Sequence, residues 1–395
     1  MSGMLAGLTI VEGAAFIAGP SCALHFAQAG AAVIRFDQIG GGPDARRWPR
    51  AANGASYYWD GLNKGKKSIA LDLARPEGRL LAQRLACAAD GIFVTNYPAE
   101  GFLSWNNLSA LRADLICLRV MGWPDGTPAV DYTVNAACGV PLMTGPVSDT
   151  RPVNHVLPAW DLLAGAHGAF ALLAALRNRD ANGGGRELRL SLSDLAAATL
   201  GNLGSVAETL AGGDRPRGGN DLFGAFGRDF TTADGVRLMI VAITARQWSG
   251  LLEVLRIADE VSAVEAARGV SFAADEGLRY LHRDALFPLV EAAVGARAAA
   301  ELEASFSARG VCFARYRSLG EALTAEPRMF GDASLFETVT HPSGTYPTPL
   351  APLRPAVRDS LAAPRLGQHT DEILATVLGM SGREIGGLHD KGIVA

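Results

Sequence analysis

The chain has 395 residues, of which 49% are hydrophobic and 19% are charged. This composition is typical of a globular protein with a sizeable core, and the length favours two domains, or one large domain that carries a smaller one. The 36 basic and 40 acidic residues give a net charge of −4, which argues against a general nucleic-acid binder or a membrane-surface protein. We therefore expect neither kind of partner.

Two further features lead us to expect a cytoplasmic protein. The longest nearly uncharged run, 162–176, is shorter than the roughly 20 apolar residues that span a bilayer, and the N-terminus carries no basic leader. The five cysteines are widely spaced and form no Cys-x-x-Cys pair. We expect reduced thiols and no metal site.

The first 40 residues predict a strand, a helix and a second strand. Residues 8–12 (LTIVE) and 31–37 (AAVIRFD) are strand-like, and residues 20–29 form a helical segment that ends at Gly30. Such a unit opens many dinucleotide-binding domains. However, Gly13 and Gly19 are too far apart for a Gly-x-Gly-x-x-Gly fingerprint, so the segment predicts only a generic Rossmann-like turn.

The same alternation continues along the chain. Strands are predicted at 68–73, 91–96, 115–120 and 186–192, and Pro76 begins a helix. Strands that alternate with helices indicate an α/β fold with a parallel sheet flanked by helices. Ligands of such sheets bind beyond the carboxyl ends of the strands, where Glu12, Asp37, Asn96 and Val120 lie.

The pattern changes after about residue 210. A glycine-rich stretch over 211–230 leads into two short strands around an Asp-Gly turn, and amphipathic helices follow to about 330. A proline-rich connection over 341–364 precedes two closing helices at 370–378 and 382–389. We expect a large domain over 1–210, a small α+β domain over 211–330, and a segment over 331–395 that returns to the large domain.

Asp161 is the only charged residue in the apolar segment 156–176, and it lies where the predicted helix begins. An aspartate at this place has two interpretations. It can be an N-cap whose carboxylate accepts a backbone N–H, as most such residues are. It can also be a nucleophilic or acid/base carboxylate in a site that excludes water. The local pattern leaves both open.

Two basic clusters flank the expected ligand edge of the sheet. Arg46, Arg47 and Arg50 follow three glycines, and a second cluster lies in the segment NKGKKSIALDL at 63–73. Basic side chains beside loop N–H groups suit a phosphorylated ligand. Either cluster taken alone is better explained by solvated surface lysines and arginines.

Five segments in order resemble the class III CoA-transferases. They are LAGLTIVEGAAFIAGPSCALHFAQAGAAVIRFD, NKGKKSIALDLARPEGRLLAQRLACAADGIFVTNYP, GGGRELRLSLSDLAA, FTTADGVRLMIVA and PRLGQHTDEIL. The resemblance covers essentially the whole chain. It implies a Rossmann-like large domain formed by both chain ends, a smaller inserted domain and an interlocked homodimer. It also implies an acyl-CoA substrate and no cofactor beyond coenzyme A itself.

The resemblance gives Asp161 a chemical role. In the family, an aspartate opens a helix of small residues that ends in Ala-Leu before a basic residue, as do Ala175, Leu176 and Arg177 here. That aspartate attacks the acyl-CoA thioester and then carries coenzyme A itself. Asp161 is accordingly the expected catalytic residue.

The resemblance also implies contacts to coenzyme A. They fall on Ile17, Ala18, Leu62, Asn63, Lys64, Asn96 and Tyr97. The family often has an arginine after its second strand, where this chain has Gln38. We therefore expect Arg46, Arg47 or Lys67 to contact the adenosine phosphates.

Two other residues are expected near the substrate. Asp131 matches the family's second acidic position, although an ordinary helix cap explains it equally well. His155 is a candidate for orienting a substrate carboxylate, whereas His167, on an apolar helix, is predicted to be a hydrogen-bonded core histidine. Val130 stands where acyl-CoA racemases have a proton-abstracting histidine, which argues against that branch.

Within the family, VDYTVNAACGVPLMTG and NHVLPAWD are most similar to the mesaconyl-CoA transferases, which move coenzyme A between the two carboxyl groups of one methylfumarate. A glycine-rich loop at 218–227 lies where the family has a mobile cover over the site. The alternatives are intermolecular transfer to another small dicarboxylate, a Rossmann dehydrogenase, and a non-catalytic acyl-CoA-binding protein.

Overall fold

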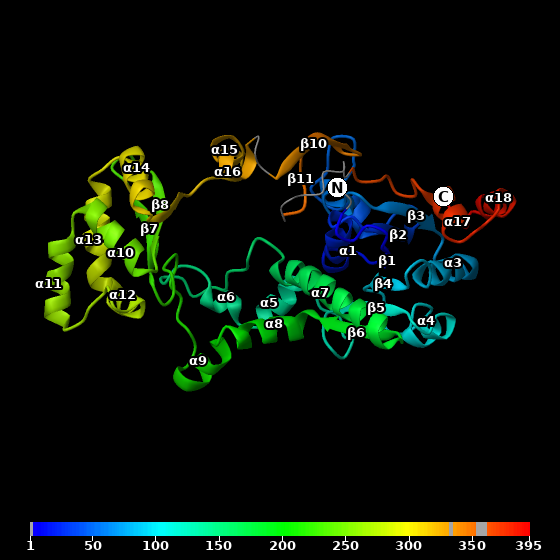
Figure 1. Ribbon diagram of the computed structural model, residues 1–395, viewed down its shortest axis with the longest axis horizontal. Helices are drawn as coiled ribbons and strands as arrows, with labels where there is room; N and C mark the ends of the chain where they lie inside the picture. Colours follow the sequence, from blue (N-terminus) through cyan, green and yellow to red (C-terminus); the bar gives the residue numbers. More distant parts are fainter. Residues whose placement is uncertain (1–2, 332–334, 353–361) are drawn as a thin grey trace. The chain divides into compact units, whose positions relative to one another are not determined.

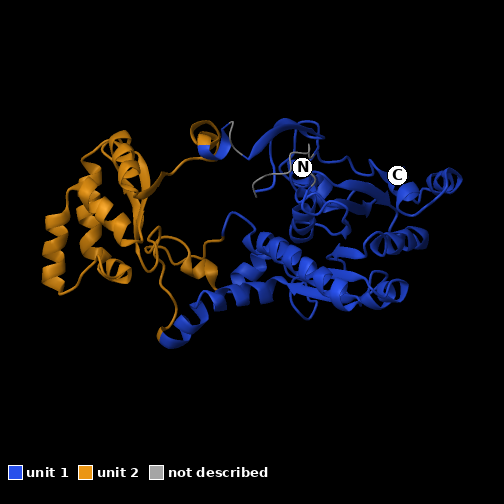
Figure 2. Cartoon of the chain, in the orientation of Figure 1, with its two compact units in different colours: residues 1–138, 155–211, 328–395 blue, residues 139–154, 212–327 orange. Residues whose placement is uncertain are grey.

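The structure is a computed structural model that describes residues 3–331, 335–352 and 362–395. The chain forms two compact units (Figure 2). Unit 1 comprises residues 1–138, 155–211 and 328–395, and unit 2 comprises 139–154 and 212–327. Residues 139–154, for which no separate grouping was expected, belong to unit 2. Both ends of the chain belong to unit 1.

Unit 1 is built on a six-stranded parallel sheet with the order β3-β2-β1-β4-β5-β6. Its strands are β1 (Thr9–Gly13), β2 (Ala32–Gln38), β3 (Lys67–Leu71), β4 (Ile92–Thr95), β5 (Ile116–Met121) and β6 (Arg186–Ser191). Most are short apolar runs buried on both faces, as parallel strands between helices must be. The predicted α/β fold with a parallel sheet is confirmed.

Helices surround this sheet (Figure 1). They are α1 (Ala18–Gln28), η1 (Pro43–Arg46), α2 (Tyr57–Asn63), α3 (Pro76–Ala86), α4 (Trp105–Leu111), α5 (Asp131–Ala137), α7 (Ala159–Asn182), α8 (Leu192–Asn202), α17 (Thr370–Thr376) and α18 (Gly382–Asp390). Local signals explain several starts. Ser56 accepts a hydrogen bond from the backbone N–H of Trp59 and so caps α2, while Pro76 occupies the first position of α3.

The C-terminal segment contributes more than the two closing helices. The start of the proline-rich connection forms β11 (Gly344–Pro349), which pairs with the preceding β10 (Phe336–His341) in a hairpin of unit 1. Residues 353–361 of that connection lie outside the described residues. Ile373, Leu374 and Ile385 from the closing helices enter the same core cluster as β1 and β3. This core joins both ends of the chain in one unit.

Unit 2 has its own core around a three-stranded antiparallel sheet with the order β7-β8-β9. Its elements are α6 (Val140–Met143), β7 (Phe226–Thr231), β8 (Arg237–Ala242), α10 (Ala245–Leu255), α11 (Ala258–Arg268), α12 (Glu276–Leu281), α13 (Arg283–Gly295), α14 (Ala299–Arg309), β9 (Cys312–Arg315) and α15 (Leu319–Ala325). Helices α9 (Ser205–Gly212) and α16 (Pro327–Phe330) lie at the two boundaries. The smaller α+β domain is confirmed, and β9 adds a strand that the sequence did not predict.

Two glycines bring α1 and α7 into close contact. A Cβ on Gly165 would lie 2.7 Å from Ser21 Oγ, and one on Gly168 would lie 3.4 Å from Cys22 Sγ. Glycine is therefore what permits α7 to lie this near α1 and the sheet. Among the described residues α7 is the one helix long and apolar enough to cross a membrane, a weak signal that core helices of soluble proteins also give.

Candidate active site

A cavity of about 690 Å³ opens at the carboxyl edge of the parallel sheet. Its lining comes from the loops after β1, β4 and β5 and from the start of α7. The strand order reverses direction between β1 and β4, and ligands of doubly wound sheets bind at such a point. Seven predicted site residues line this cavity, namely Ile17, Ala18, Arg47, Asn96, Tyr97, Asp131 and Asp161.

Asp161 is the third residue of α7, and Pro158 occupies the N-cap position without a side-chain cap. The interpretation of Asp161 as the cap of its own helix is therefore wrong. The cap comes instead from Asp131, whose Oδ2 accepts the backbone N–H of Trp160 at 2.7 Å and that of Asp161 at 3.2 Å. This contact satisfies two donors that the first turn of a helix leaves free.

Asp131 is also not an ordinary cap, because it is the first residue of α5 and caps a neighbouring helix. It is 1% exposed. Its second oxygen, Oδ1, lies 2.6 Å from Nε2 of His155. Indole Nε1 of Trp160 donates to Oδ1 of Asn135 at 3.1 Å, which further joins α5 to α7. His155 thus contacts Asp131 and is not among the residues that line the cavity.

The surroundings of Asp161 favour its neutral form. Burial raises the pKa of Asp161 to about 7, the negative charge of Asp131 adds to the increase, and the positive charge of Arg47 opposes it. The positive end of α7 would favour a carboxylate, but burial and the second carboxylate outweigh it. Asp161 is therefore a poorly solvated carboxyl group that ionises near neutral pH.

The loop that faces Asp161 is held in a strained shape. Phe16 has a positive φ of 66°, which a non-glycine residue rarely adopts. Its backbone N–H donates to Oδ1 of Asp44 at 2.8 Å. The amide of Asn96 donates to the carbonyl of Ala15 and accepts its N–H, both at 3.0 Å. Two polar side chains from other loops therefore fix the backbone that precedes α1.

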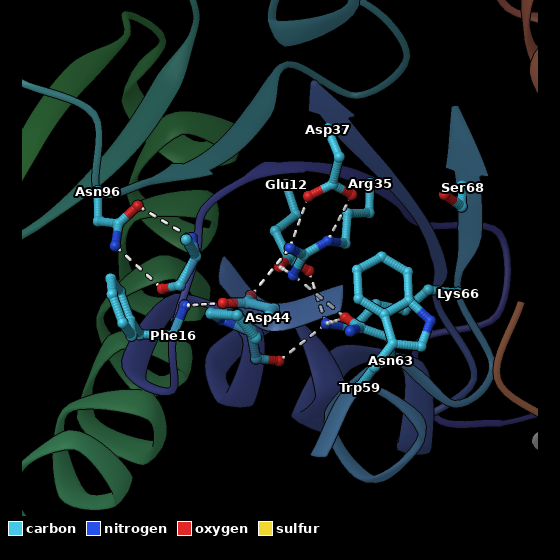
Figure 3. A network of polar contacts seen from close by, with 12 residues as sticks. Glu12, Phe16, Arg35, Asp37, Asp44, Trp59, Asn63, Lys66, Ser68 and Asn96 are labelled. Atoms are coloured by element: carbon cyan, nitrogen blue, oxygen red, sulfur yellow. Dashed lines mark hydrogen bonds and ion pairs between the residues drawn. The ribbon is translucent and has the colours of Figure 1, made fainter. Parts of the chain in front are cut away.

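Asp44 belongs to a buried charge network (Figure 3). At its centre Arg35 donates to Glu12 at 2.8 Å, to Asp37 at 2.7 Å and to Asp44 at 3.0 Å. Lys66 Nζ lies 2.6 Å from the second oxygen of Glu12, and both cations are at most 3% exposed. Since removal of one partner would leave buried charges uncompensated, this network makes the loop geometry costly to change.

The network changes the interpretation of one basic cluster. Lys66 is buried against Glu12 and is not available to a phosphate. Asn63, a predicted coenzyme A contact, accepts hydrogen bonds from Arg35 at 3.2 Å and from Lys66 at 3.0 Å. Its side chain therefore points into the network. The spacing of the lysines alone gave no sign of this, because the partners come from β1 and β2.

A second cavity of about 470 Å³ shares Ile17 and Pro158 with the first. It is lined by two further predicted contacts, Leu62 and Lys64. Burial lowers the pKa of Lys64 to about 8. The ammonium form still predominates at neutral pH, and an anion bound here would raise this pKa again.

The remaining predicted phosphate contacts lie on the surface. Arg46 is exposed and donates to the carbonyl of Gly40 at 2.8 Å. Lys67, about half exposed, pairs with Glu372 at 2.5 Å. Gln38 is held against the turn after β3, where its side chain accepts the backbone N–H of Leu73 at 2.8 Å. Of the three candidate cations, only Arg47 lines the first cavity.

Several residues near Asp161 were not predicted from the sequence. Phe16, Tyr132 and Pro158 line the same cavity. The side chain of Tyr58 lies close enough to Asp161 for the charge of that residue to raise the pKa of the Tyr58 phenol. Tyr132 and Pro158 lie within the quoted segments VDYTVNAACGVPLMTG and NHVLPAWD, but nothing in those segments singled them out. Phe16 follows two alanines in a glycine-rich turn, and that turn was the only available hint.

The prediction for His167 was wrong. It lies on the exposed face of α7, where its ring is 6.3 Å from that of Phe170. Across the described part of the chain, no group of three or more His, Cys, Asp or Glu side chains is arranged to hold a metal ion.

Comparisons with known proteins agree on the kind of protein. The model of CoA-transferase family III matches residues 5–370. The chain is 46% identical over 404 residues to the 2-methylfumaryl-CoA isomerase of Chloroflexus aurantiacus, covering 100% of this chain and 98% of that protein. It is 28% identical over 400 residues to the succinyl-CoA–D-citramalate CoA-transferase of the same organism, covering 98% of this chain and 96% of that protein.

A solved structure shares the fold. The CAIB/BAIF family protein from Brucella suis superposes with a TM-score of 0.75 at 24% identity, covering 95% of this chain and 99% of that one. At this identity the likeness bears on the fold alone. It agrees with the parallel sheet and the second, smaller unit described above.

Proposed function

Because the chain belongs to CoA-transferase family III, we propose that it moves coenzyme A from one carboxyl group of 2-methylfumarate to the other within a single substrate molecule. The observation that carries this proposal is the 46% identity, over the full length of both chains, to a 2-methylfumaryl-CoA isomerase. The cavity at the edge of the sheet, with Asp161 in its wall, supplies a site for the reaction.

Asp161 is the nucleophile of this proposal. Its ionised carboxylate attacks the thioester carbonyl at the first carboxyl of the substrate, and the carbon–sulfur bond breaks to give a mixed anhydride and coenzyme A thiolate. The thiolate then attacks the aspartyl carbonyl of the anhydride. This step leaves coenzyme A as a thioester of Asp161 and releases 2-methylfumarate as its dianion.

The second half repeats these steps in reverse order at the other end of the acid. The carboxylate at the fourth carbon (C4) of the acid attacks the Asp161 thioester and displaces the thiolate, which gives a new mixed anhydride. The thiolate attacks the substrate carbonyl of that anhydride and regenerates the Asp161 carboxylate. Each bond broken is matched by one of similar energy, so the reaction needs no ATP.

The site must also keep the intermediates from water. The carboxyl groups are trans across the double bond, so the acid cannot close a cyclic anhydride and must turn around beside the loaded Asp161. Retention of the free acid favours a confined cavity. The family resemblance assigns a mobile cover to the glycine-rich loop at 218–227, which leads into β7, and this assignment stays a prediction.

We place coenzyme A along the two adjoining cavities. Ile17, Ala18, Asn96 and Tyr97 line the first, and Leu62 and Lys64 line the second. The buried ammonium of Lys64, which lines the second cavity, suits a phosphate oxygen. Arg46 and Lys67 stay candidates for contacts at the outer end of the cofactor, while Asn63 supports the loop from within.

Asp131 and His155 act on Asp161 indirectly in this proposal. Asp131 caps the turn that carries the nucleophile, and His155 holds the other oxygen of Asp131. We therefore regard both as positioning residues. His155 has no contact with the cavity that would let it orient a substrate carboxylate.

We also propose that the protein is an interlocked homodimer and works in the cytoplasm. The structure of one chain leaves apolar side chains exposed along α7 and the segment that follows it. They include Leu162, Leu163, Phe170, Leu173, Leu203, Val206 and Leu210, of which Leu210 is 85% exposed. A second copy would cover such a patch. Interlocked subunits should not exchange between two differently tagged samples until the protein is unfolded.

The test of the dimer is direct. Light scattering after size-exclusion chromatography should give twice the chain mass, and Phe170→Glu should weaken or abolish the dimer. Leu281→Glu, which replaces a 65% exposed leucine on α12, is the control and should leave the mass unchanged. A wild-type protein that elutes as a monomer at micromolar concentration would contradict this part of the proposal.

The test of the reaction incubates the purified enzyme with one regioisomer of 2-methylfumaryl-CoA alone and follows the other by chromatography. We expect interconversion without added acid. Labelled free 2-methylfumarate should not enter the product, and its entry would instead indicate intermolecular transfer. Absence of any interconversion would contradict the isomerase assignment while leaving the family membership intact.

The test of the nucleophile uses trapping. Hydroxylamine or borohydride should inactivate the enzyme only in the presence of the acyl-CoA, and Asp161→Asn should abolish both activity and this sensitivity. Asp125→Asn, at the rim of the same cavity, is the matched control and should keep both. Full activity of Asp161→Asn would show that the protein uses another group.

A further inference from the structure

Arg47 is a cation in the wall of the cavity that lacks a carboxylate partner. Within the described residues, no acidic oxygen lies within ion-pair distance of its guanidinium, and its side chain is only partly exposed. Its guanidinium carbon lies instead 5.6 Å from the ring centre of Phe16 and 5.0 Å from that of Tyr58. Contact with two rings restrains the guanidinium and leaves its N–H donors for a ligand.

Tyr58 presents a second unused donor beside Arg47. Its hydroxyl is buried, yet it has no hydrogen-bond partner among the described residues. Burial raises the pKa of Tyr58, so the phenol keeps its proton, and the charges of Arg47 and Asp161 both act on it. A buried donor without an acceptor is costly, roughly 1–3 kcal/mol. A ligand oxygen at this point would remove that cost.

The position of Tyr58 joins the two cavities. Its ring lines the second cavity, which shares Ile17 and Pro158 with the first. Arg47 and Asp161, whose charges reach its hydroxyl, line the first cavity. Tyr58 therefore lines one cavity, while its hydroxyl is near two charged residues that line the other.

No other cation that lines the first cavity has donors free to bind a carboxylate. Arg119 lines the first cavity, but its donors are used by Glu187 at 2.8 Å and by the backbone carbonyls of Tyr97 and Leu103, at 2.7 Å and 2.8 Å. The remaining charged residues in the lining are acidic, namely Glu100, Asp125, Asp131 and Asp161. A substrate that carries a free carboxylate would be repelled from this cavity except beside Arg47.

We propose that Arg47 and Tyr58 form the subsite for the non-reacting carboxylate of a dicarboxylyl-CoA substrate. The guanidinium would hold the two oxygens, and the phenol would donate to one of them. This inference rests on the proposed function, because only a diacid leaves a free carboxylate after its thioester has formed. It assigns Arg47 to the acyl group and not to the phosphates of coenzyme A.

One subsite then serves both halves of the reaction. While the carboxyl group at C1 of the acid reacts at Asp161, Arg47 and Tyr58 hold the carboxylate at C4. After the acid has turned around, the C1 carboxylate occupies that subsite and the C4 carboxylate reacts at Asp161. The fixed cation also compensates the negative charge of the acid, which would otherwise face Asp131 and Asp161 at the moment of attack.

The experiment compares two thioesters that differ only at the far end of the acyl chain. One is 2-methylfumaryl-CoA esterified at its first carboxyl, and the other is (E)-2-methylbut-2-enoyl-CoA, which has a methyl group in place of the free carboxylate. Binding is measured by titration calorimetry in the Asp161→Asn background, so that neither thioester reacts. The readout is the ratio of the two dissociation constants.

We expect the parent protein to bind the diacid thioester more tightly than the methyl analogue by on the order of 10-fold or more. Arg47→Gln should bring this ratio close to one by weakening only the diacid thioester, and Arg47→Lys should restore part of it. Tyr58→Phe should reduce the ratio several-fold. Arg50→Gln and Tyr57→Phe, which alter neighbouring side chains of the same types, are the controls and should leave the ratio unchanged.

Two outcomes would overturn the subsite. An equal loss of affinity for both thioesters in Arg47→Gln would place Arg47 on coenzyme A, and an unchanged ratio would remove it from the site. Melting curves confirm that each variant is folded. Because the ratio needs no turnover, it stands apart from the proposed reaction, whose failure would appear as a lack of regioisomer interconversion in the wild type.

Discussion

The carboxylate of Asp131 accepts a hydrogen bond from the backbone N–H of Asp161 at 3.2 Å, across 30 residues of sequence. One carboxylate thus caps the helical turn that carries the other. The contact holds the two acids at a fixed separation, and the charge of Asp131 adds to the effect of burial in raising the pKa of Asp161 to about 7. Both the position and the protonation of the proposed nucleophile depend on this pair.

The first prediction concerns the pH profile. Asp161 must be ionised to attack, so kcat/KM should fall as the pH drops below about 7. Asp131→Asn removes a negative charge beside it and should move this acidic limb to lower pH. Since burial is the larger cause, the limb should stay above the ordinary carboxyl value of 3.8. A pH–rate series with both proteins measures the shift.

The opposite shift is the control for that experiment. Arg47→Gln removes the positive charge that lowers the pKa of Asp161 and should move the acidic limb to higher pH. If both variants moved the limb in the same direction, or if neither moved it, the limb would belong to another group.

The second prediction concerns stability. The pKa of Asp161 is higher in the folded protein than its value of 3.8 in the unfolded chain, so this residue makes the folded state less stable as the pH rises from about 4 to 7. Asp161→Asn removes this penalty. It should stabilise the protein at pH 8 by roughly 2–4 kcal/mol and should have little effect near pH 4.

Urea unfolding of Asp161→Asn at the two pH values gives these free energies. Asp125→Asn is a control of opposite sign. Hydrogen bonds from Thr127 hold the pKa of Asp125 below its ordinary value, so loss of that carboxylate should lower stability at neutral pH. A destabilised Asp161→Asn at pH 8 would contradict the buried setting of the nucleophile.

The third prediction separates two adjacent lysines. Lys66 is buried and contacts Glu12 at 2.6 Å, whereas Lys67 is 48% exposed and contacts Glu372 at 2.5 Å. Lys66→Met leaves a buried carboxylate short of a partner and should cost about 3–5 kcal/mol of the free energy of unfolding. Lys67→Met should cost less than about 1 kcal/mol. Similar losses from both substitutions would argue against the buried network.

The fourth prediction concerns the contact between α1 and α7. A Cβ on Gly165 would lie 2.7 Å from Ser21 Oγ and 3.2 Å from the carbonyl of Ala18, so Gly165→Ala must push the helices apart. We expect a loss of about 1–3 kcal/mol. Gly165 lies four residues after Asp161 on the same face of α7, so activity should fall as well.

Gly386→Ala is the matched control for that substitution. Gly386 lies inside α18, and a Cβ there would meet no atom within 4 Å. This alanine should therefore stabilise the protein by about 0.5–1 kcal/mol. Thermal and urea unfolding of both variants measure the difference, and a neutral Gly165→Ala would show that the helices have room to adjust.

Much of the fold could be predicted from the sequence because strands and helices have local signatures. The short, mostly apolar stretches of β1, β2 and β5 are continuous along the chain, and Pro76 marks a helix start by its own geometry. The third strand of unit 2, Cys312–Arg315, was missed because four residues between helical segments carry too little pattern.

The candidate site was predicted only in part for the same physical reason. Asp161 could be singled out because it is the only charge in an apolar segment, and the ordered motifs indicated the family. His167 was misplaced because an apolar helix of small residues looks buried on every side, whereas one face of α7 is exposed in the single chain.

The sequence by itself therefore determined the family, the order of the elements and the identity of the proposed nucleophile, since each depends on neighbouring residues or on motifs in order. Only the tertiary structure decided which side chains serve it. Packing of α5 against α7 turned Asp131 into the cap of another helix, and the buried partners of Lys66 and Arg35 come from separate strands. Arg46 and Arg47 are adjacent and alike in sequence, yet only Arg47 lines the cavity of Asp161, because the direction of a side chain in a loop is set by what packs around it.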